Sequence, residues 1–278
     1  MKYVLNVLYP QIGLRVDLRD PSGKIRKVDV MAKERETPAI LTGVDRWRAG
    51  LDRQENWRQL QPVSVEFGSQ LMILRLSNFM MTDFIADGLV DKARQHSALI
   101  VDLRGNPGGS LETLRRFLGD LFEQEIKVGD EIRRDKTTHV VTKGRHGSAF
   151  TGNLLVLVDS ESASAAEIFS RVVQLEKRGT VLGDVTSGSV MAAEFLPHHY
   201  GTHQVLTYGM EVSVADFIMT DGKSLEHTGV IPDERMLPSQ EDMAAGRDPV
   251  MAAAAARAGI TLTPEKAAQL FPAEWLRN

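Results

Sequence analysis

Two segments of the chain share one pattern: a short apolar run, a turn of small and polar residues, and then an amphipathic helix. The first reads LIVDLRGNPGGS over residues 99–110, and the second reads LLVLVDSESASAAEIFS over residues 154–170. A continuously apolar run of this length before a helix is typical of a buried parallel strand in an α/β sheet. Since parallel strands deliver their carboxyl ends to one edge of the sheet, the two turns are expected to lie side by side.

The residues of these two turns could support acyl transfer. Gly108 and Gly109 leave backbone N–H groups unshielded at the start of a helix, which suits an anion or a developing oxyanion. Ser164 offers a hydroxyl at the start of the other helix, and an N–H pair with a hydroxyl is the minimum for nucleophilic acyl transfer. Structural interpretations also exist: the glycines can form a tight turn, and Ser164 with Glu167 fits an S-x-x-E capping box.

Composition restricts the class of protein and its partners. With 278 residues, 42% of them hydrophobic and 25% charged, the chain has the composition of a globular protein of one large or two small domains. A net charge of −4 with scattered basic residues argues against a nucleic-acid partner. The absence of cysteine excludes disulfides and thiol catalysis, and no histidine or carboxylate spacing suggests a metal site. We therefore expect neither a metal nor a cofactor.

No segment reads as a membrane span or a leader. No apolar run approaches the length needed to cross a bilayer. The N-terminal MKYVLNVLYPQIG carries a short apolar stretch that Asn6, Pro10 and Gln11 interrupt, and no small-residue cleavage site follows it. It is interpreted as mature sequence.

The order of predicted elements is that of an α/β protein. Residues 13–33 alternate apolar and polar residues around Asp-Pro-Ser-Gly, which predicts a hairpin, and residues 34–62, with Trp47 and Trp57, show no clean period. Strands and helices then alternate, as in right-handed βαβ units. The predicted strands are LMILRL from Leu71 and residues 98–103, 154–158 and 180–182, with a long strand pair between 204 and 219 completing the sheet; the predicted helices are 82–95, 110–123, 164–177 and 248–258. The polar stretch 127–145 is predicted as a hairpin or surface loop.

Four motifs in order resemble one known family. They are DLRGNPGG at residues 102–109, SASAAE at 162–167, VADFIMTDGKSLEHTGVIPD at 214–233, and AAGRDPVMAAAA from Ala244. Together they resemble the tail-specific or C-terminal processing serine peptidases, including their tricorn-like branch. The resemblance covers residues 69–258.

This resemblance implies a fold, a domain organisation and partners. The fold would be a crotonase-like superhelix of βαβ units, preceded by the last strands of a PDZ-like module. The domains would be 1–35 (end of the PDZ-like module), 36–68 (linker), 69–258 (peptidase core) and 259–278 (C-terminal extension). The partner would be a peptide or protein substrate bound as an extra strand at a sheet edge. Family members also suggest an extracytoplasmic location and a possible homo-oligomer.

The same resemblance implies roles for the turn residues. Ser164, rather than the competing Ser160 or Ser162, would be the nucleophile. The N–H of Gly108 or Gly109 would form an oxyanion hole with that of Ala165. Asp102 and Arg104 are expected to hold the turn through buried pairing, and Asn106 to cap it.

The general base is where the sequence departs from the main family. Processing peptidases place a lysine and a glutamine at positions that here hold Ser189 and Ala193. A serine hydroxyl cannot accept the nucleophile's proton near neutral pH. The tricorn-like branch instead uses a histidine from ahead of the PDZ-like module together with a glutamate, which Glu226 matches. Four histidines near the motifs, without a motif match, remain alternatives: His198, His199, His203 and His227.

Two functional hypotheses follow. The first is a serine endopeptidase-like hydrolase that acts on extended peptides through Ser164, supported by Glu226. The alternative is a catalytically inactive or truncated family member that acts as a binding or scaffolding module, because Ser189 replaces the family lysine.

Overall fold

The chain divides into two compact units, residues 1–56 and 57–278. The computed structural model describes residues 13–19, 24–31, 61–200 and 206–271. In the first unit, strand β1 (Gly13–Arg19) pairs antiparallel with β2 (Ile25–Met31), which confirms the predicted hairpin. The rest of the segment predicted as a linker up to residue 60, with both of its tryptophans, lies outside the described residues, as do residues 272–278.

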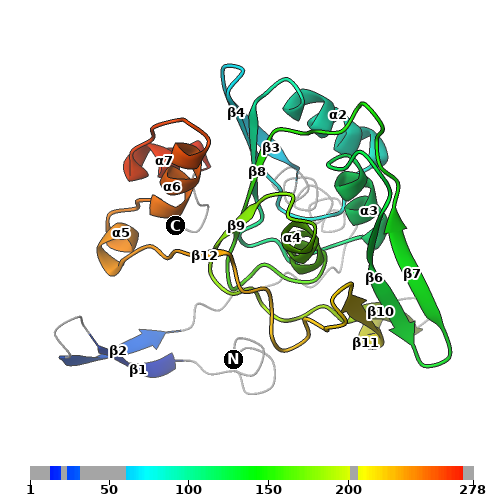
Figure 1. Cartoon of the computed structure of the whole chain (residues 1–278). Coiled ribbons are helices and arrows are strands. Elements are labelled where there is room, and N and C mark those ends of the chain that lie inside the picture. The colour runs from blue at the N-terminus through cyan, green and yellow to red at the C-terminus, as the bar shows by residue number, and fades with distance from the viewer. Residues whose placement is uncertain (1–12, 20–23, 32–60, 201–205, 272–278) are drawn as a thin grey trace, which may run out of the picture. The chain divides into compact units, whose positions relative to one another are not determined.

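The second unit is built on a six-stranded mixed sheet with helices on both of its faces (Figure 1). Its strands, in spatial order, are β12 (Glu234–Arg235), β9 (Thr180–Gly183), β8 (Asn153–Val158), β5 (Ala98–Asp102), β4 (Leu71–Arg75) and β3 (Val63–Phe67). All neighbouring pairs are parallel except β3 with β4. The parallel strands therefore deliver their carboxyl ends to one edge, where the two glycine- and serine-containing turns lie.

One edge strand falls inside the segment predicted as a linker. The range 36–68 was expected to carry no strand, yet Val63–Phe67 pairs with β4 along its whole length. This strand is only partly buried, because it lies at the edge of the sheet. Its apolar signal is correspondingly weak, which explains why the sequence pattern did not separate it from the preceding polar residues.

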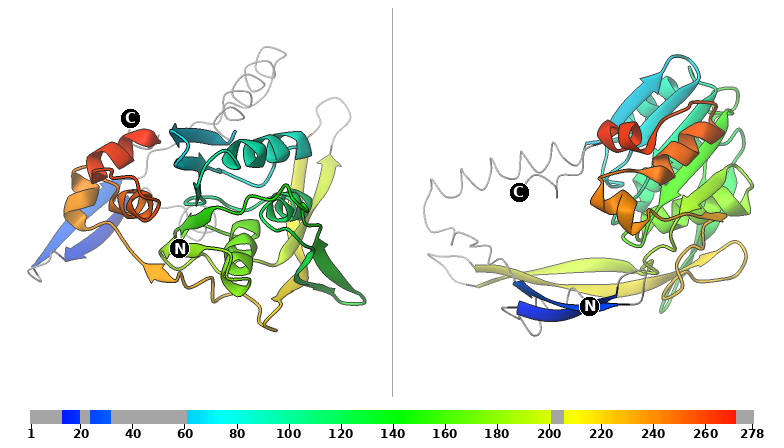
Figure 2. Two further views of the ribbon diagram at one scale, coloured as in Figure 1. Left: turned by 45° about the horizontal axis from the view of Figure 1, so that its top comes forward. Right: turned by 90° about the vertical axis from the view of Figure 1, so that its left-hand side faces the viewer.

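Alternate residues of the central strands face two separate hydrophobic cores. One core packs the strands against helices α2 (Asp83–Ala93), α3 (Leu111–Gly119) and α4 (Ala165–Leu175). The other packs the opposite face against α6 (Pro249–Arg257) and α7 (Pro264–Leu270). Figure 2 shows α6 and α7 over one face of the sheet, after the short helix α5 (Gln240–Ala244). Burial on both faces accounts for the continuously apolar strand sequences.

The range 259–278, expected to be an extension, contributes to the second core. Helix α7 lies in this range, and Ala267 on it is 2% exposed within the core that α6 forms with the sheet. The predicted core boundary at residue 258 is therefore too early for the described part of the chain.

A second sheet of four antiparallel strands flanks the first core. Its order is β10 (Ala192–Tyr200), β11 (Leu206–Met219), β6 (Ile126–Arg133) and β7 (Thr137–Thr142). The β6–β7 pair confirms a hairpin in the polar stretch 127–145. The expected strand pair within residues 204–219 is wrong. The described part of this stretch, 206–219, is one long strand whose partner is β10, and neither strand belongs to the main sheet (Figure 2). β10 was not predicted because Pro197 and the adjacent histidines are typical of a loop. Proline is tolerated there because β10 is an edge strand.

Candidate active site

The sheet brings the two turns singled out in the sequence into direct contact. Strands β5 and β8 are parallel neighbours, and the N–H of Leu103 donates to the carbonyl of Leu157 at 2.9 Å, just beyond the paired strands. One step further, the N–H of Ala163 donates to the carbonyl of Asn106 at 2.9 Å. The prediction that these strand ends lie side by side is confirmed.

Gly108 lies against Ser164, and only glycine fits there. A Cβ atom on Gly108 would stand 2.6 Å from Ser164 Cβ, and the residue has a φ of 101° that side chains rarely adopt. Gly109 has a φ of 144°, and a Cβ atom there would stand 2.6 Å from the backbone of Phe79. The two glycines therefore allow the turn to approach both the serine and the loop after β4.

The hydrogen bonds distinguish the two glycine N–H groups. The N–H of Gly108 donates to Asn106 Oδ1 at 2.8 Å, so it is already occupied. The bridge between Phe79 and Gly109 uses the carbonyl of Gly108 and the N–H of Ser110, at 2.7 and 2.8 Å, and does not use the N–H of Gly109. Among the hydrogen bonds of the described residues, the N–H groups of Gly109 and Ala165 have no acceptor.

The nitrogen of Asn106 completes this turn. Its Nδ2 donates to the carbonyl of Leu76 at 2.7 Å, and the side chain is fully buried. The asparagine thus ties the glycine turn to the end of β4, as its predicted capping role requires.

Ser164 has a strained backbone at the start of α4. Its φ of 55° and ψ of −118° place it in a region that non-glycine residues seldom occupy. Such a conformation costs on the order of 1–3 kcal/mol and is found most often at functional sites. The N–H of Ser164 donates to the carbonyl of Ser189 at 2.9 Å and to Glu167 Oε2 at 3.0 Å. The surrounding structure therefore holds the serine in its strained position.

The competing serines differ from Ser164 in their surroundings. Ser162 is fully buried, and its hydroxyl donates to the carbonyl of Leu103 at 2.8 Å and accepts from the N–H of Asp159 at 3.0 Å. It therefore links the two turns and is closed to a substrate. Ser160 is exposed on the same turn.

Glu167 connects the serine turn to the turn at residues 186–189. Its carboxylate is fully buried and accepts four hydrogen bonds. Oε1 accepts from Thr186 Oγ1 at 2.6 Å and from the N–H of Gly188 at 2.7 Å. Oε2 accepts from the N–H groups of Ser164 at 3.0 Å and Ser189 at 2.9 Å. The sequence showed only its capping role, because the other partners lie in a distant turn.

The position of the family lysine lies beside the serine. Ser189 accepts from the N–H of Ser164 through its carbonyl, and its exposed side chain accepts a hydrogen bond from Ser187 Oγ at 3.2 Å. Ala193, at the position of the family glutamine, is exposed near the start of β10. Neither side chain can take a proton at neutral pH.

Glu226 binds the loop that follows Ser189. Its Oε2 accepts from the N–H groups of Val190 at 2.8 Å and Met191 at 3.1 Å. Among the hydrogen bonds of the described residues, its Oε1 has no donor. The carboxylate therefore braces this loop and keeps one oxygen available.

The histidines near the motifs do not form a described pair with Ser164. His227 is exposed with a φ of 62°, and its backbone N–H donates to the carbonyl of Gly188 at 2.8 Å. His198 and His199 lie in β10, so the predicted loop there is wrong, and their side chains are outside the description, as is His203 entirely. Within the described ranges, no group of three or more metal-binding side chains is arranged to hold an ion. No helix of that part of the chain is long and apolar enough to span a bilayer.

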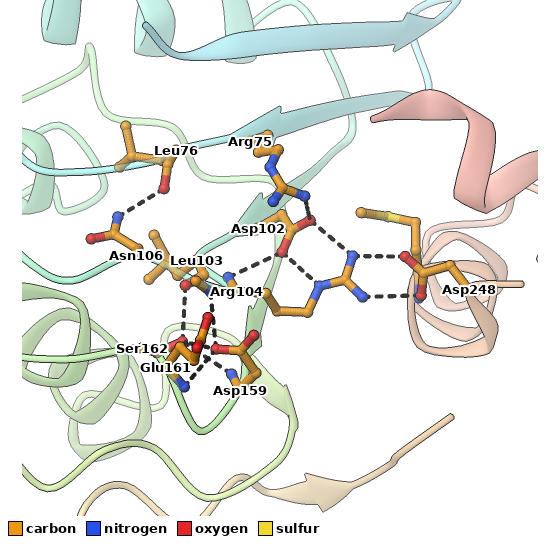
Figure 3. A network of polar contacts seen from close by, with 12 residues as sticks. Arg75, Leu76, Asp102, Leu103, Arg104, Asn106, Asp159, Glu161, Ser162 and Asp248 are labelled. Atoms are coloured by element: carbon orange, nitrogen blue, oxygen red, sulfur yellow. Dashed lines mark hydrogen bonds and ion pairs between the residues drawn. The ribbon is translucent and has the colours of Figure 1, made fainter. Parts of the chain in front are cut away.

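A buried ion-pair network supports the glycine turn from the other side (Figure 3). Arg104 contacts both Asp102 oxygens at 2.8 and 2.9 Å and both Asp248 oxygens at 3.0 and 2.8 Å. Asp248 caps α6, so the network joins the end of β5 to the start of helix α6. Burial alone would raise the pKa of Asp102, but the guanidinium groups of Arg104 and Arg75 outweigh it and hold the pKa below its ordinary value. The expected buried pairing of Asp102 with Arg104 is present.

Residues 70–236 match Peptidase family S41. This match covers more than half of the chain. The chain belongs to Peptidase family S41. The family resemblance inferred from the sequence motifs is thereby confirmed.

Curated relatives carry the names expected for family S41. A carboxyl-terminal-processing protease of Synechocystis is 28% identical over 226 residues, which cover 78% of this chain and 48% of that protein. A tail-specific protease of Haemophilus influenzae is 29% identical over 60% of this chain and 24% of that protein. A putative tricorn protease homolog of Streptomyces coelicolor is 30% identical over 55% and 12%. The chain thus spans between 12% and 48% of the length of these three relatives.

Solved structures share the mixed α/β fold of this S41 chain. A putative peptidase from Parabacteroides merdae matches with a TM-score of 0.55 and 21% identity, over 74% of this chain and 68% of that chain. Mature CPAF complexed with lactacystin matches with a TM-score of 0.56 and 13% identity, over 85% and 65%.

Proposed function

We propose that this S41 chain contains the catalytic core of a serine endopeptidase that cleaves extended peptides by acyl transfer through Ser164. One observation carries the proposal. The strained Ser164 lies against the glycine turn, and two N–H groups beside it, those of Gly109 and Ala165, have no acceptor among the described residues. Unoccupied N–H groups next to a nucleophile are what an oxyanion requires.

The chemistry assigned to these groups is that of a serine acyl transfer. Ser164 Oγ attacks the carbonyl carbon of the scissile bond while a base accepts its proton. The N–H groups of Gly109 and Ala165 donate to the oxyanion, and loss of one such donor costs about 3–4 kcal/mol in the barrier. The base returns the proton to the leaving amine, and water then hydrolyses the acyl-enzyme. Gly108 supports this arrangement structurally, because its own N–H is held by Asn106.

A histidine is the base that best suits the carboxylate geometry. Glu226 keeps Oε1 without a donor among the described residues, so it can accept a hydrogen bond from an imidazole N–H. The histidine would come from a segment outside the described residues or from a second copy of the chain. The family's lysine cannot serve, since Ser189 stands at its position.

The finer features of the fold and substrate belong to the same proposal. The βαβ core would be crotonase-like, and the β1–β2 hairpin would be the end of a PDZ-like module. An extended peptide would add to the edge strand β10, which begins directly after the loop that Glu226 braces. The names of the processing and tail-specific relatives support a peptide or protein substrate. The extracytoplasmic location belongs to the same proposal and rests on the family resemblance.

Labelling with a fluorophosphonate tests the nucleophile, because the reagent requires an activated serine. We expect labelling at Ser164 that Ser164→Ala abolishes. The matched control is Ser160→Ala, since Ser160 is an exposed serine of the same turn, and this variant should be labelled normally. Labelling that persists in Ser164→Ala would refute the assignment.

Glu226→Gln tests the proposed base. The rate of labelling or of peptide hydrolysis should follow a histidine-like pKa near neutrality and fall in this variant. We expect the 278-residue chain alone to be weakly active, and a longer form that supplies the histidine to be more active. Full activity of the chain alone would direct the search to His198, His199, His203 and His227.

A further inference from the structure

A pocket opens in the loop that connects β4 to α2. Its volume is about 370 Å³, which is small for a ligand site and suits one or two amino-acid side chains. Its walls are Gln61, Pro62, Asn78, Met80, Met81, Thr82 and Ile85. This loop follows the carboxyl end of β4, the same sheet edge at which the glycine and serine turns lie.

The loop that forms one wall of the pocket is tied to the glycine turn through the backbone of Phe79. Phe79 is the one residue between Asn78 and Met80, which both line the pocket. Its N–H donates to the carbonyl of Gly108 at 2.7 Å, and its carbonyl accepts from Ser110 at 2.8 Å. Asn78 Oδ1 accepts from the N–H of Met80 at 2.8 Å and fixes the pocket wall relative to this bridge. These bonds place the wall of the pocket beside the turn that carries the N–H of Gly109.

The lining of the pocket is uncharged and mostly apolar. None of its seven residues carries an ionisable side chain. A charged group entering it would lose hydration without a residue of opposite charge in the lining to compensate. Methionine side chains adapt to different apolar shapes, so Met80 and Met81 can accommodate several aliphatic groups.

Two large apolar side chains in this segment are exposed. Met80 is 60% exposed on the pocket wall, and Phe84, in the first turn of α2, is 86% exposed. Neighbouring exposed apolar side chains often mark an interaction site. Met80 lines the pocket, whereas Phe84 does not.

We propose that this pocket binds an apolar side chain of the peptide substrate next to the scissile bond, and so determines the specificity of the S41 site. The inference rests on the proposed function, because it takes the glycine turn as the place where the carbonyl is bound. The recognised side chain is apolar, and substitution of Met80 is expected to alter this preference.

Peptide binding to the Ser164→Ala chain tests the pocket without requiring turnover. The probes are two fluorescent octapeptides of alanine and glycine that differ in one central residue, leucine or aspartate. Burial of the leucine side chain should make its peptide bind about tenfold tighter or more, as measured by fluorescence anisotropy. Equal affinities for the two peptides would overturn the proposal.

A matched pair of lysine substitutions tests whether the pocket determines the preference for leucine over aspartate. Met80→Lys places a cation on the pocket wall and should weaken binding of the leucine peptide while strengthening binding of the aspartate peptide. Phe84→Lys adds the same charge to the same segment outside the pocket and should leave the ratio of the two affinities unchanged. A ratio that shifts equally in both variants would mean that surface charge, not the pocket, decides.

The two proposals fail in different ways. If Ser164 is not labelled by the fluorophosphonate even in a form that supplies the histidine, the proposed function is wrong whatever the peptides show. If Ser164 is labelled but Met80→Lys leaves the peptide preference unchanged, only the pocket assignment is wrong.

Discussion

Replacing Glu167 by glutamine is expected to destabilise the fold and to lower the reactivity of Ser164. Each oxygen of this buried carboxylate accepts two hydrogen bonds. Glutamine keeps one oxygen and presents an NH₂ group in place of the other. In either orientation, two of the four donors then face a donor in a fully buried site.

The expected loss of stability in Glu167→Gln follows from these lost hydrogen bonds. A hydrogen bond to a charged group contributes about 1.5–3 kcal/mol. Loss of two such bonds predicts a decrease in the free energy of unfolding of about 3 kcal/mol or more. Whichever oxygen is lost, at least one donor on the turn at residues 186–189 loses its acceptor. Because Ser164 and this turn are connected through Glu167, the serine should also lose its fixed position.

Urea unfolding and the rate of fluorophosphonate labelling measure the two effects. Glu176→Gln is the matched control, since Glu176 is exposed at the other end of the same helix and should change neither quantity. If Glu167→Gln lowered stability by less than about 1 kcal/mol and left labelling unchanged, the linking role inferred for this carboxylate would be refuted.

Three further outcomes are expected. Ser164→Gly should raise the free energy of unfolding by about 1 kcal/mol, because glycine adopts a positive φ without strain. Ser164→Ala should not raise it. Equal thermal midpoints for the two variants would contradict the inference that Ser164 is strained. Asp102 has a pKa held below its ordinary value, so its ionised form contributes stability above about pH 4 that is lost as the pH falls through the folded-state pKa. Asp102→Asn should therefore be less stable than the parent at neutral pH, with a difference that shrinks below about pH 4; a difference independent of pH in chemical unfolding would contradict this. Ser189→Lys should increase peptidase activity if the pocket still suits a partly buried lysine base, and an intact fold with no gain would show that the site is built for another base.

Local sequence patterns determined the units of this fold. The continuous apolar runs before each turn identified β5 and β8, since strands buried on both faces need no alternation. The motif order identified Peptidase family S41, and the serine and glycine turns are local enough for their residue types to define them. The edge strands β3 and β10 were missed because strands at a sheet edge bury too little surface to leave a clear pattern.

The tertiary structure decided which chemical groups are available. The sequence left Gly108 and Gly109 equivalent, but Asn106 folds back on the turn and occupies the N–H of Gly108. It also left Ser162 as a competitor of Ser164, until the pairing of β5 with β8 placed the Ser162 hydroxyl on a carbonyl of the neighbouring turn. The Asn106 side chain is held in this position by the carbonyl of Leu76, and Ser162 by that of Leu103. Both partners lie far away in the chain, so the sheet brings them together and no local periodicity can encode them.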